Sequence, residues 1–434
     1  MTQPRIEFRK DVLASFGAEG EVADEILEYN QNHFDQSAID LSTFPWPDEM
    51  FVSAWRQYAR ATEEAGSILP LAKYLVQLQF PVREGISGSD EYIAATRRGF
   101  TTEVMQQAVG LSWHAPENCH IAIHPTGAGH VPVIIAEHRQ DFVSLVQALT
   151  HRNEPKTIPE SMGACMIAGY NNWHRLALLR ESFLASASED SSWTEEFQRI
   201  KARKELYQDR FIILSCGPYS AVPAFALGLE EQEWLRLSLA IRREHECTHY
   251  FTRHVFSSMR NNLLDELIAD YMGVTASAGR FRSGWLLWFF GLESFPIYRE
   301  GARLENYRGN PPLSDRAFAV LQKLVVATAA NLEIFDRLQI PEFQHARWRP
   351  ALMKVLTQLT VEELASKEAQ QVLRDNFAEA LKSLNPSGTI QDMNSCETIR
   401  AEFGLQSPAL AAMEAQPRHN RQQPCHLHEK EEHQ

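Results

Sequence analysis

The sequence predicts an α+β protein, and three patterns in its 434 residues support this class. Apolar residues recur at helical spacing from about residue 7 to 80. Two short β-rich runs, 119–125 and 131–138, follow and are separated by a glycine-containing turn. A third β-branched run, 211–217, precedes a long helical stretch at 229–259.

Within the first half, 22–34 and 50–78 are expected to be helices, because both repeat apolar residues every three or four positions. The segment TGAG at 126–129 is expected to be a turn that joins two strands. Helices are expected again at 141–152 and 191–210. Several helices around short strands predict a large mixed α/β N-terminal region.

In the second half, Gly217 and Pro218 close the third strand. An amphipathic helix is expected at 317–338, and a small helical extension at 350–384, where Thr360 is followed by Glu363 in a capping pattern.

We therefore expect four regions: a mixed region of unassigned role at 1–205, a central domain at 206–345, the helical extension at 346–405, and a tail at 406–434 that is too polar to pack and is expected to be disordered.

Charge and composition exclude several functions. The formal net charge of −14 argues against binding to nucleic acid or to an anionic membrane. The N-terminus lacks the apolar stretch of a signal peptide, and the apolar run 284–291 is too short to span a bilayer. Six cysteines without a CxxC pair are typical of reduced thiols. These features predict a cytoplasmic protein whose metal sites, if any, use ligands other than cysteine.

The sequence HECTH, residues 245–249, is the motif that carries chemistry. His245 and His249 lie four residues apart, so they project from one face of a helix and one metal ion can contact both. Glu246 lies on an adjacent side, where it can hydrogen-bond a water on that metal. The alternative is that the motif arose by chance in a chain with sixteen histidines.

Two observations favour the metal site. Both histidines lie on the apolar stripe of their helix, where an imidazole needs a polar partner. Glu266 and Asp270 also lie on an apolar stripe, four residues apart. Sixteen residues separate His249 from Glu266, which fits a helical hairpin with arms of about eight residues, or about 12 Å. The hairpin would make Glu266 the third ligand and place Asp270 behind a ligand histidine.

HECTH followed by ELIAD, residues 266–270, resembles the gluzincin group of zinc metallopeptidases, whose pattern is HExxH and then ExxxD. The resemblance covers about 26 residues, 245–270, and implies a zincin-like metallohydrolase domain with an active-site helix hairpin. It implies that His245, His249 and Glu266 bind Zn²⁺, that Glu246 is the general base, and that Asp270 orients a ligand.

Other residues of the expected site are less well defined. Tyr298 and Tyr307 are candidates for stabilising an oxyanion, although both could equally pack in a surface loop with neighbouring arginines. The strand at 211–217 is either the edge that binds an extended peptide or a core strand. Cys247 points away from both histidines and is expected to be an inert, packed side chain.

The predicted function is a zinc-dependent hydrolase, most simply a peptidase, in which Glu246 activates water. Two alternatives stay open. One is a zinc-containing regulatory or binding protein that does not turn over substrate. The other is a hydrolase that acts on a small metabolite in a closed pocket, whereas a peptidase needs a groove open at both ends.

Overall fold

The structure is a computed structural model that describes residues 3–37, 39–186, 192–259, 261–341 and 345–384. Met1–Met393 form one compact unit. The last part of the helical extension expected at 346–405, from residue 385 on, lies outside the described residues. The tail expected to be disordered lies outside the described residues. Helices and a small sheet confirm the α+β class.

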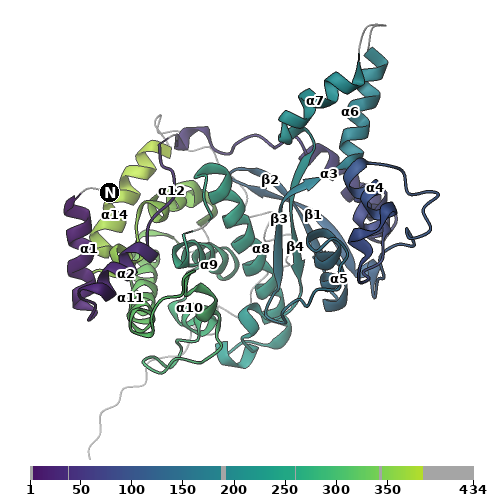
Figure 1. The fold of residues 1–434 in the computed structure, drawn as a ribbon. Coiled ribbons are helices and arrows are strands. Elements are labelled where there is room, and N and C mark those ends of the chain that lie inside the picture. The colour runs from purple at the N-terminus through teal and green to yellow at the C-terminus, as the bar shows by residue number, and fades with distance from the viewer. Residues whose placement is uncertain (1–2, 38, 187–191, 260, 342–344, 385–434) are drawn as a thin grey trace, which may run out of the picture. The chain divides into compact units, whose positions relative to one another are not determined.

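The sheet has four strands in the order β1-β2-β4-β3 (Figure 1). The strands are β1 (Cys119–Thr126), β2 (Gly129–Ala136), β3 (Ala164–Asn171) and β4 (Gln208–Ser215). β1 and β2 form the antiparallel hairpin that the sequence predicts, β2 and β4 are parallel, and β3 is antiparallel to β4. β4 therefore lies inside the sheet, and β3 is an edge strand.

Helices cover both faces of this sheet. The long helix α8 (Glu231–Val255) packs on one face, and α3 (Val52–Glu64) and α5 (Arg139–Thr150) pack on the other (Figure 1). Side chains of a strand alternate between faces, and the β-branched run of β4 serves both cores: Ile212 and Leu214 join the core with α8, whereas Phe211 and Ile213 join the core with α3 and α5.

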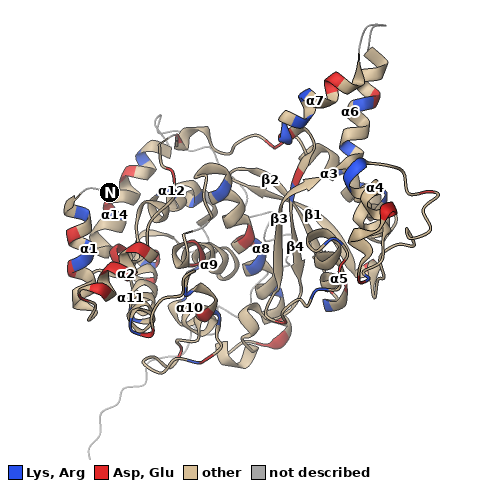
Figure 2. Cartoon of the chain, viewed as in Figure 1, with Lys and Arg blue, Asp and Glu red and all other residues tan. Residues whose placement is uncertain are grey.

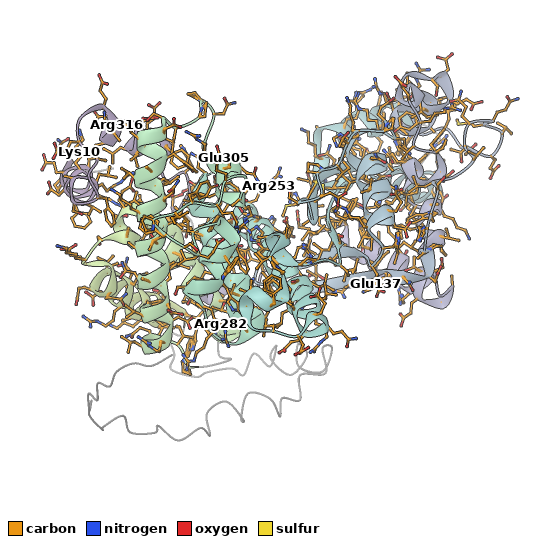
Figure 3. The ribbon with its side chains drawn as sticks, turned by 90° about the horizontal axis from the view of Figure 1, so that it is seen from below. Lys10, Glu137, Arg253, Arg282, Glu305 and Arg316 are labelled. Carbon is orange, nitrogen blue, oxygen red and sulfur yellow. The ribbon has the colours of Figure 1, made fainter. Side chains whose placement is uncertain are left out.

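A helical half of the chain continues the core of α8. Its helices are α1 (Gln3–Ser15), α2 (Glu21–Tyr29), α9 (Leu263–Ala278), α10 (Ser283–Phe290), α11 (Asp315–Gln339), α12 (His345–Gln358), α13 (Val361–Ala365) and α14 (Ala369–Leu384). Three further helices accompany the sheet half: α4 (Asp90–Arg98), α6 (Trp173–Ser186) and α7 (Trp193–Ala202). In Figure 3, Lys10 and Arg316 mark the helical half, and Glu137 marks the sheet half.

The pair α8 and α9 forms an antiparallel hairpin in which the helices approach closely. Gly273 of α9 makes this possible, because a Cβ atom at this position would lie 2.8 Å from the carbonyl oxygen of Ile241 in α8. The hairpin arms are shorter than expected, since α8 ends at Val255 and α9 begins at Leu263. The polar loop between them contains Ser257 and Asn262, both with positive φ.

Several predicted helices end earlier than their apolar spacing indicates, among them the one expected at 22–34, which ends at Tyr29. The helix expected at 50–78 ends at Glu64, because Gly66 has a φ of 60° and Pro70 follows, and the chain continues in short 3₁₀ turns. The helix expected at 191–210 ends at Ala202, and its last residues enter β4 instead, where pairing with β3 outweighs their local preference.

Among the described helices, α11 has the length and apolar composition of a membrane span. Half of that apolar window is buried inside the protein, and α11 packs against α10, α13 and α2. Burial of this kind is typical of a core helix in a soluble protein. Figure 2 shows basic and acidic residues interleaved on α1, α7 and α14.

Candidate metal centre

The helix α8 presents His245 and His249 on one face, as their spacing predicts. The two Nε2 atoms lie 3.1 Å apart, and both side chains are buried. Two imidazole nitrogens at this separation, turned toward each other in the interior, need a shared proton or a shared cation between them.

The first turn of α9 adds Glu266 to this pair. Its carboxylate oxygens lie 3.4 Å from Nε2 of His245 and 3.5 Å from Nε2 of His249. Ligand atoms bound at ~2.0–2.1 Å to a tetrahedral zinc ion are separated by about 3.3–3.4 Å. The three observed separations lie close to that value, with Oε2 of Glu266 facing His245 and Oε1 facing His249, so the three residues are near enough to bind one small cation. Among the described residues, these three make up a cluster whose ligand atoms all lie within 4.8 Å of one another.

Asp270, one turn after Glu266, lies behind His245. Its Oδ1 is 2.9 Å from Nδ1 of His245, and its side chain is fully buried. Tyr219 donates its hydroxyl to the same carboxylate oxygen over 2.5 Å and also lies 2.9 Å from Nδ1 of His245. These contacts leave Nε2 as the ring nitrogen of His245 that faces the cluster.

The short helix η9 (Arg303–Tyr307) contacts the carboxylates of Glu266 and Asp270. In Figure 3, Glu305 marks η9 and Arg253 marks the last turn of α8. Arg303 binds the second oxygen of Asp270 and donates to the Tyr219 hydroxyl over 2.9 Å. Tyr307 donates to Oε2 of Glu266 over 2.8 Å. Both carboxylates are therefore held in place by donors from outside the hairpin.

The charges at the centre are strongly coupled. Burial raises the pKa of Glu266, but hydrogen bonds with His245 and His249 outweigh burial and hold this pKa well below its usual range. Burial likewise raises the pKa of Asp270, and Arg303 and His245 lower it below its ordinary value. Burial lowers the pKa of His245, while Asp270 and Glu266 raise it to about 10. Both carboxylates are thus ionised at neutral pH, and a cation is favoured between the rings.

Glu246 lies next to the cluster but does not join it. Its side chain is partly exposed, and among the described residues it has neither a hydrogen-bond partner nor an ion-pair partner. A carboxylate in this position is free to bind water, as the HExxH pattern predicts.

The two tyrosine candidates have different places. Tyr307 contacts Glu266, as described above, whereas the Tyr298 hydroxyl donates to the carbonyl of Ala302 and its ring packs on Phe318. Tyr307 therefore contacts a ligand candidate, and Tyr298 contacts a neighbouring turn and helix. Cys247 is buried, and burial raises the pKa of its thiol, which fits the expected inert side chain.

Sequence reasoning missed Tyr219. It follows β4 in the segment Gly-Pro-Tyr, which reads as an ordinary turn, and no spacing links it to a helix that starts twelve residues later. Arg303 is one of several arginines after the hairpin, and no spacing distinguishes it from the others. The structure also places the strand predicted at 211–217 inside the sheet, so its alternative reading as a peptide-binding edge is wrong and its reading as a core strand is confirmed.

The protein is thus of the mixed α+β class, with an HExxH motif on a helix and a cluster of two histidines and one glutamate. A model for a family of unknown function (DUF7005) matches residues 11–368, so the chain belongs to this family. No curated protein and no solved structure matches the chain. The matched segment contains the whole hairpin and η9.

Proposed function

We propose that this protein is a zinc-dependent metallohydrolase with a zincin-like active-site hairpin, and that its substrates are peptides. The observation that carries the proposal is the cluster of His245, His249 and Glu266, whose ligand atoms lie within 4.8 Å of one another, beside the carboxylate of Glu246, which has no partner among the described residues. Three protein ligands are the usual complement of a catalytic zinc, which keeps one position open.

Each residue has a distinct role in this proposal. His245, His249 and Glu266 would hold the zinc ion, which when bound supplies the Lewis acidity that activates water. Glu246 takes the proton from that water and later delivers it to the leaving amine. Asp270 and Tyr219 hold the ring of His245, and Tyr307 holds the carboxylate of Glu266, so that the ligands need little reorganisation.

The edge strand β3 supports a peptide over a small metabolite. β3 pairs on one side with β4 and ends the sheet on the other, so its outer backbone groups can pair with an extended chain. Helix α8, which carries Glu246, packs against β3. An extended peptide on this edge would lie beside the helix that carries the proposed base.

The unpartnered Glu246 also separates an enzyme from a zinc-containing binding protein of the same fold. A protein that only binds zinc has no use for an uncompensated carboxylate beside the metal. We therefore favour catalysis.

The test compares zinc-loaded wild-type protein with a Glu246→Gln variant on a mixture of peptides read by mass spectrometry. We expect cleavage by the wild type and a loss of about 10²–10⁴-fold in the variant, the usual contribution of a general base. Both proteins should contain equal zinc. Failure of the wild type to cleave any peptide, or equal cleavage by both proteins, would contradict a peptidase that uses Glu246.

A further inference from the structure

Two buried polar atoms beside the metal centre lack a hydrogen-bond partner among the described residues. One is Nδ1 of His249, and the other is Oδ1 of Asp265. The two residues are 6% and 3% exposed, so water is largely excluded from both. Buried polar groups without partners are rare in folded proteins because each loses its hydration without compensation.

These two side chains flank the same ligand. His249 turns Nε2 toward Glu266 over 3.5 Å, which leaves Nδ1 on the opposite edge of the ring. Asp265 directly precedes Glu266 in the first turn of α9. Its other oxygen, Oδ2, accepts from the backbone nitrogen of Asn261 and, over 3.3 Å, from the Asn261 amide. One oxygen of Asp265 is thus used by the loop, and one is left over.

The chain brings the two residues near each other, because Asp265 directly precedes Glu266, whose carboxylate lies 3.5 Å from Nε2 of His249. The electrostatics of Asp265 agree with this placement. Burial raises the pKa of Asp265, and hydrogen bonding by Asn261 together with the charge on His249 lowers it. The carboxylate of Asp265 is therefore within electrostatic reach of the His249 ring. A carboxylate and an imidazole N–H are complementary partners.

The two histidines of the centre differ in the hydrogen-bond partners of their Nδ1 atoms. Nδ1 of His245 lies 2.9 Å from the Asp270 carboxylate and 2.9 Å from the Tyr219 hydroxyl. Nδ1 of His249 has no equivalent contact within the part of the chain that the structure describes. Metal-bound histidines almost always donate their second ring N–H to a carboxylate, a carbonyl or water, and this contact fixes the tautomer that binds the metal.

We propose that Asp265 is a positioning residue for the second histidine: when zinc binds, its free oxygen accepts a hydrogen bond from Nδ1 of His249. The centre then contains two carboxylate–histidine pairs, Asp270 with His245 and Asp265 with His249. The inference rests on the metal site of the proposed function and does not depend on hydrolysis.

The test is an Asp265→Asn variant, with the zinc dissociation constant measured by competition with a chromophoric chelator. Asparagine keeps one oxygen, which can still accept from Asn261, but it presents an amide NH₂ where the second oxygen was. We expect zinc to bind about 10–100-fold more weakly, the usual effect of losing such a partner, while urea unfolding of the zinc-free protein changes little. Zinc affinity equal to wild type would overturn the inference.

A second measurement needs no variant. Zinc-loaded wild-type protein with ¹⁵N-labelled histidine should show two slowly exchanging Nδ1 protons, one from His245 and one from His249. A protected proton on His245 alone would overturn the inference.

The matched control is Asp141→Asn. Asp141 is also a fully buried carboxylate that accepts from backbone nitrogens, those of His114 and Ala115, but it lies in the sheet half. Its substitution should leave zinc affinity unchanged, and an equal loss of affinity would overturn a specific role for Asp265. Wild-type protein that binds no zinc would refute the proposed function itself. A zinc dissociation constant that is the same in wild type and Asp265→Asn would refute only this inference.

Discussion

Nδ1 of His245 lies 2.9 Å from the carboxylate of Asp270, which is itself fully buried. Arg303 and Tyr219 bind the same carboxylate from two other parts of the chain. A fully buried carboxylate is stable only when it is paired in this way. The orientation of one candidate ligand thus depends on the α8/α9 hairpin, the turn after β4 and η9 together.

We expect an Asp270→Asn variant to bind zinc about 10–100-fold more weakly than wild type. The amide retains the shape of the carboxylate but removes the charge that favours the metal-binding tautomer of His245. Competition with a chelator measures the change. Asp141→Asn provides the control, and an unchanged affinity in Asp270→Asn would show that the contact does not orient a ligand.

Direct removal of a ligand should have a larger effect. We expect purified wild-type protein to contain about one zinc ion per chain and His249→Ala or Glu266→Ala to lose it, because two remaining ligands hold zinc poorly. Elemental analysis of the three proteins is the measurement, with the exposed His33→Ala as a matched control. Retention of zinc in both ligand variants would place the metal elsewhere.

Chelation should destabilise the wild type alone. A ligand that binds only the folded state raises the melting temperature, so we expect EDTA to lower the Tm of wild-type protein. The Glu266→Ala variant, already free of zinc, should show no response to EDTA. Calorimetry of both proteins with and without EDTA checks this, and an equal response in both would exclude the cluster as the zinc site.

The close approach of α8 and α9 should be sensitive to Gly273→Ala. The added Cβ would lie 2.8 Å from the backbone oxygen of Ile241, which cannot move without displacing α8. We expect a loss of about 1–3 kcal/mol in unfolding free energy, the usual cost of overpacking, measured by urea denaturation. Gly284→Ala in α10 is the control, since its Cβ would meet open space, and it should raise stability by up to ~1 kcal/mol.

A buried ion pair in the sheet half should dominate local stability. Asp209 binds Arg175 with both side chains almost fully buried, and it also accepts from Trp55 over 2.8 Å. We expect Asp209→Ala to cost about 3–5 kcal/mol, because it leaves a buried guanidinium without its anion. The exposed pair of Glu205 with Arg203 offers a contrast, and Glu205→Ala should cost at most about 1 kcal/mol. Similar losses in denaturant midpoint for both variants would refute this assignment.

Much of the candidate centre follows from local spacing. His245 and His249 are four positions apart, as are Glu266 and Asp270, and this spacing places each pair on one helix face whatever surrounds the helices. The hairpin itself could be predicted because the intervening residues are polar and of the right number. The length of its arms could not, since the loop that contains Ser257 and Asn262, both with positive φ, begins earlier and ends later than helix spacing indicates.

The sequence by itself determined what depends on neighbours along the chain: the α+β class, the β1/β2 hairpin, and the two helix faces that carry His245, His249, Glu266 and Asp270. Only the tertiary structure decided which strand lies at the sheet edge, and which distant side chains complete the centre. Tyr219, Arg303 and Tyr307 reach the carboxylates through packing of elements far apart in sequence. Such contacts depend on how helices and strands pack to bury their apolar faces, and local sequence patterns do not predict this packing.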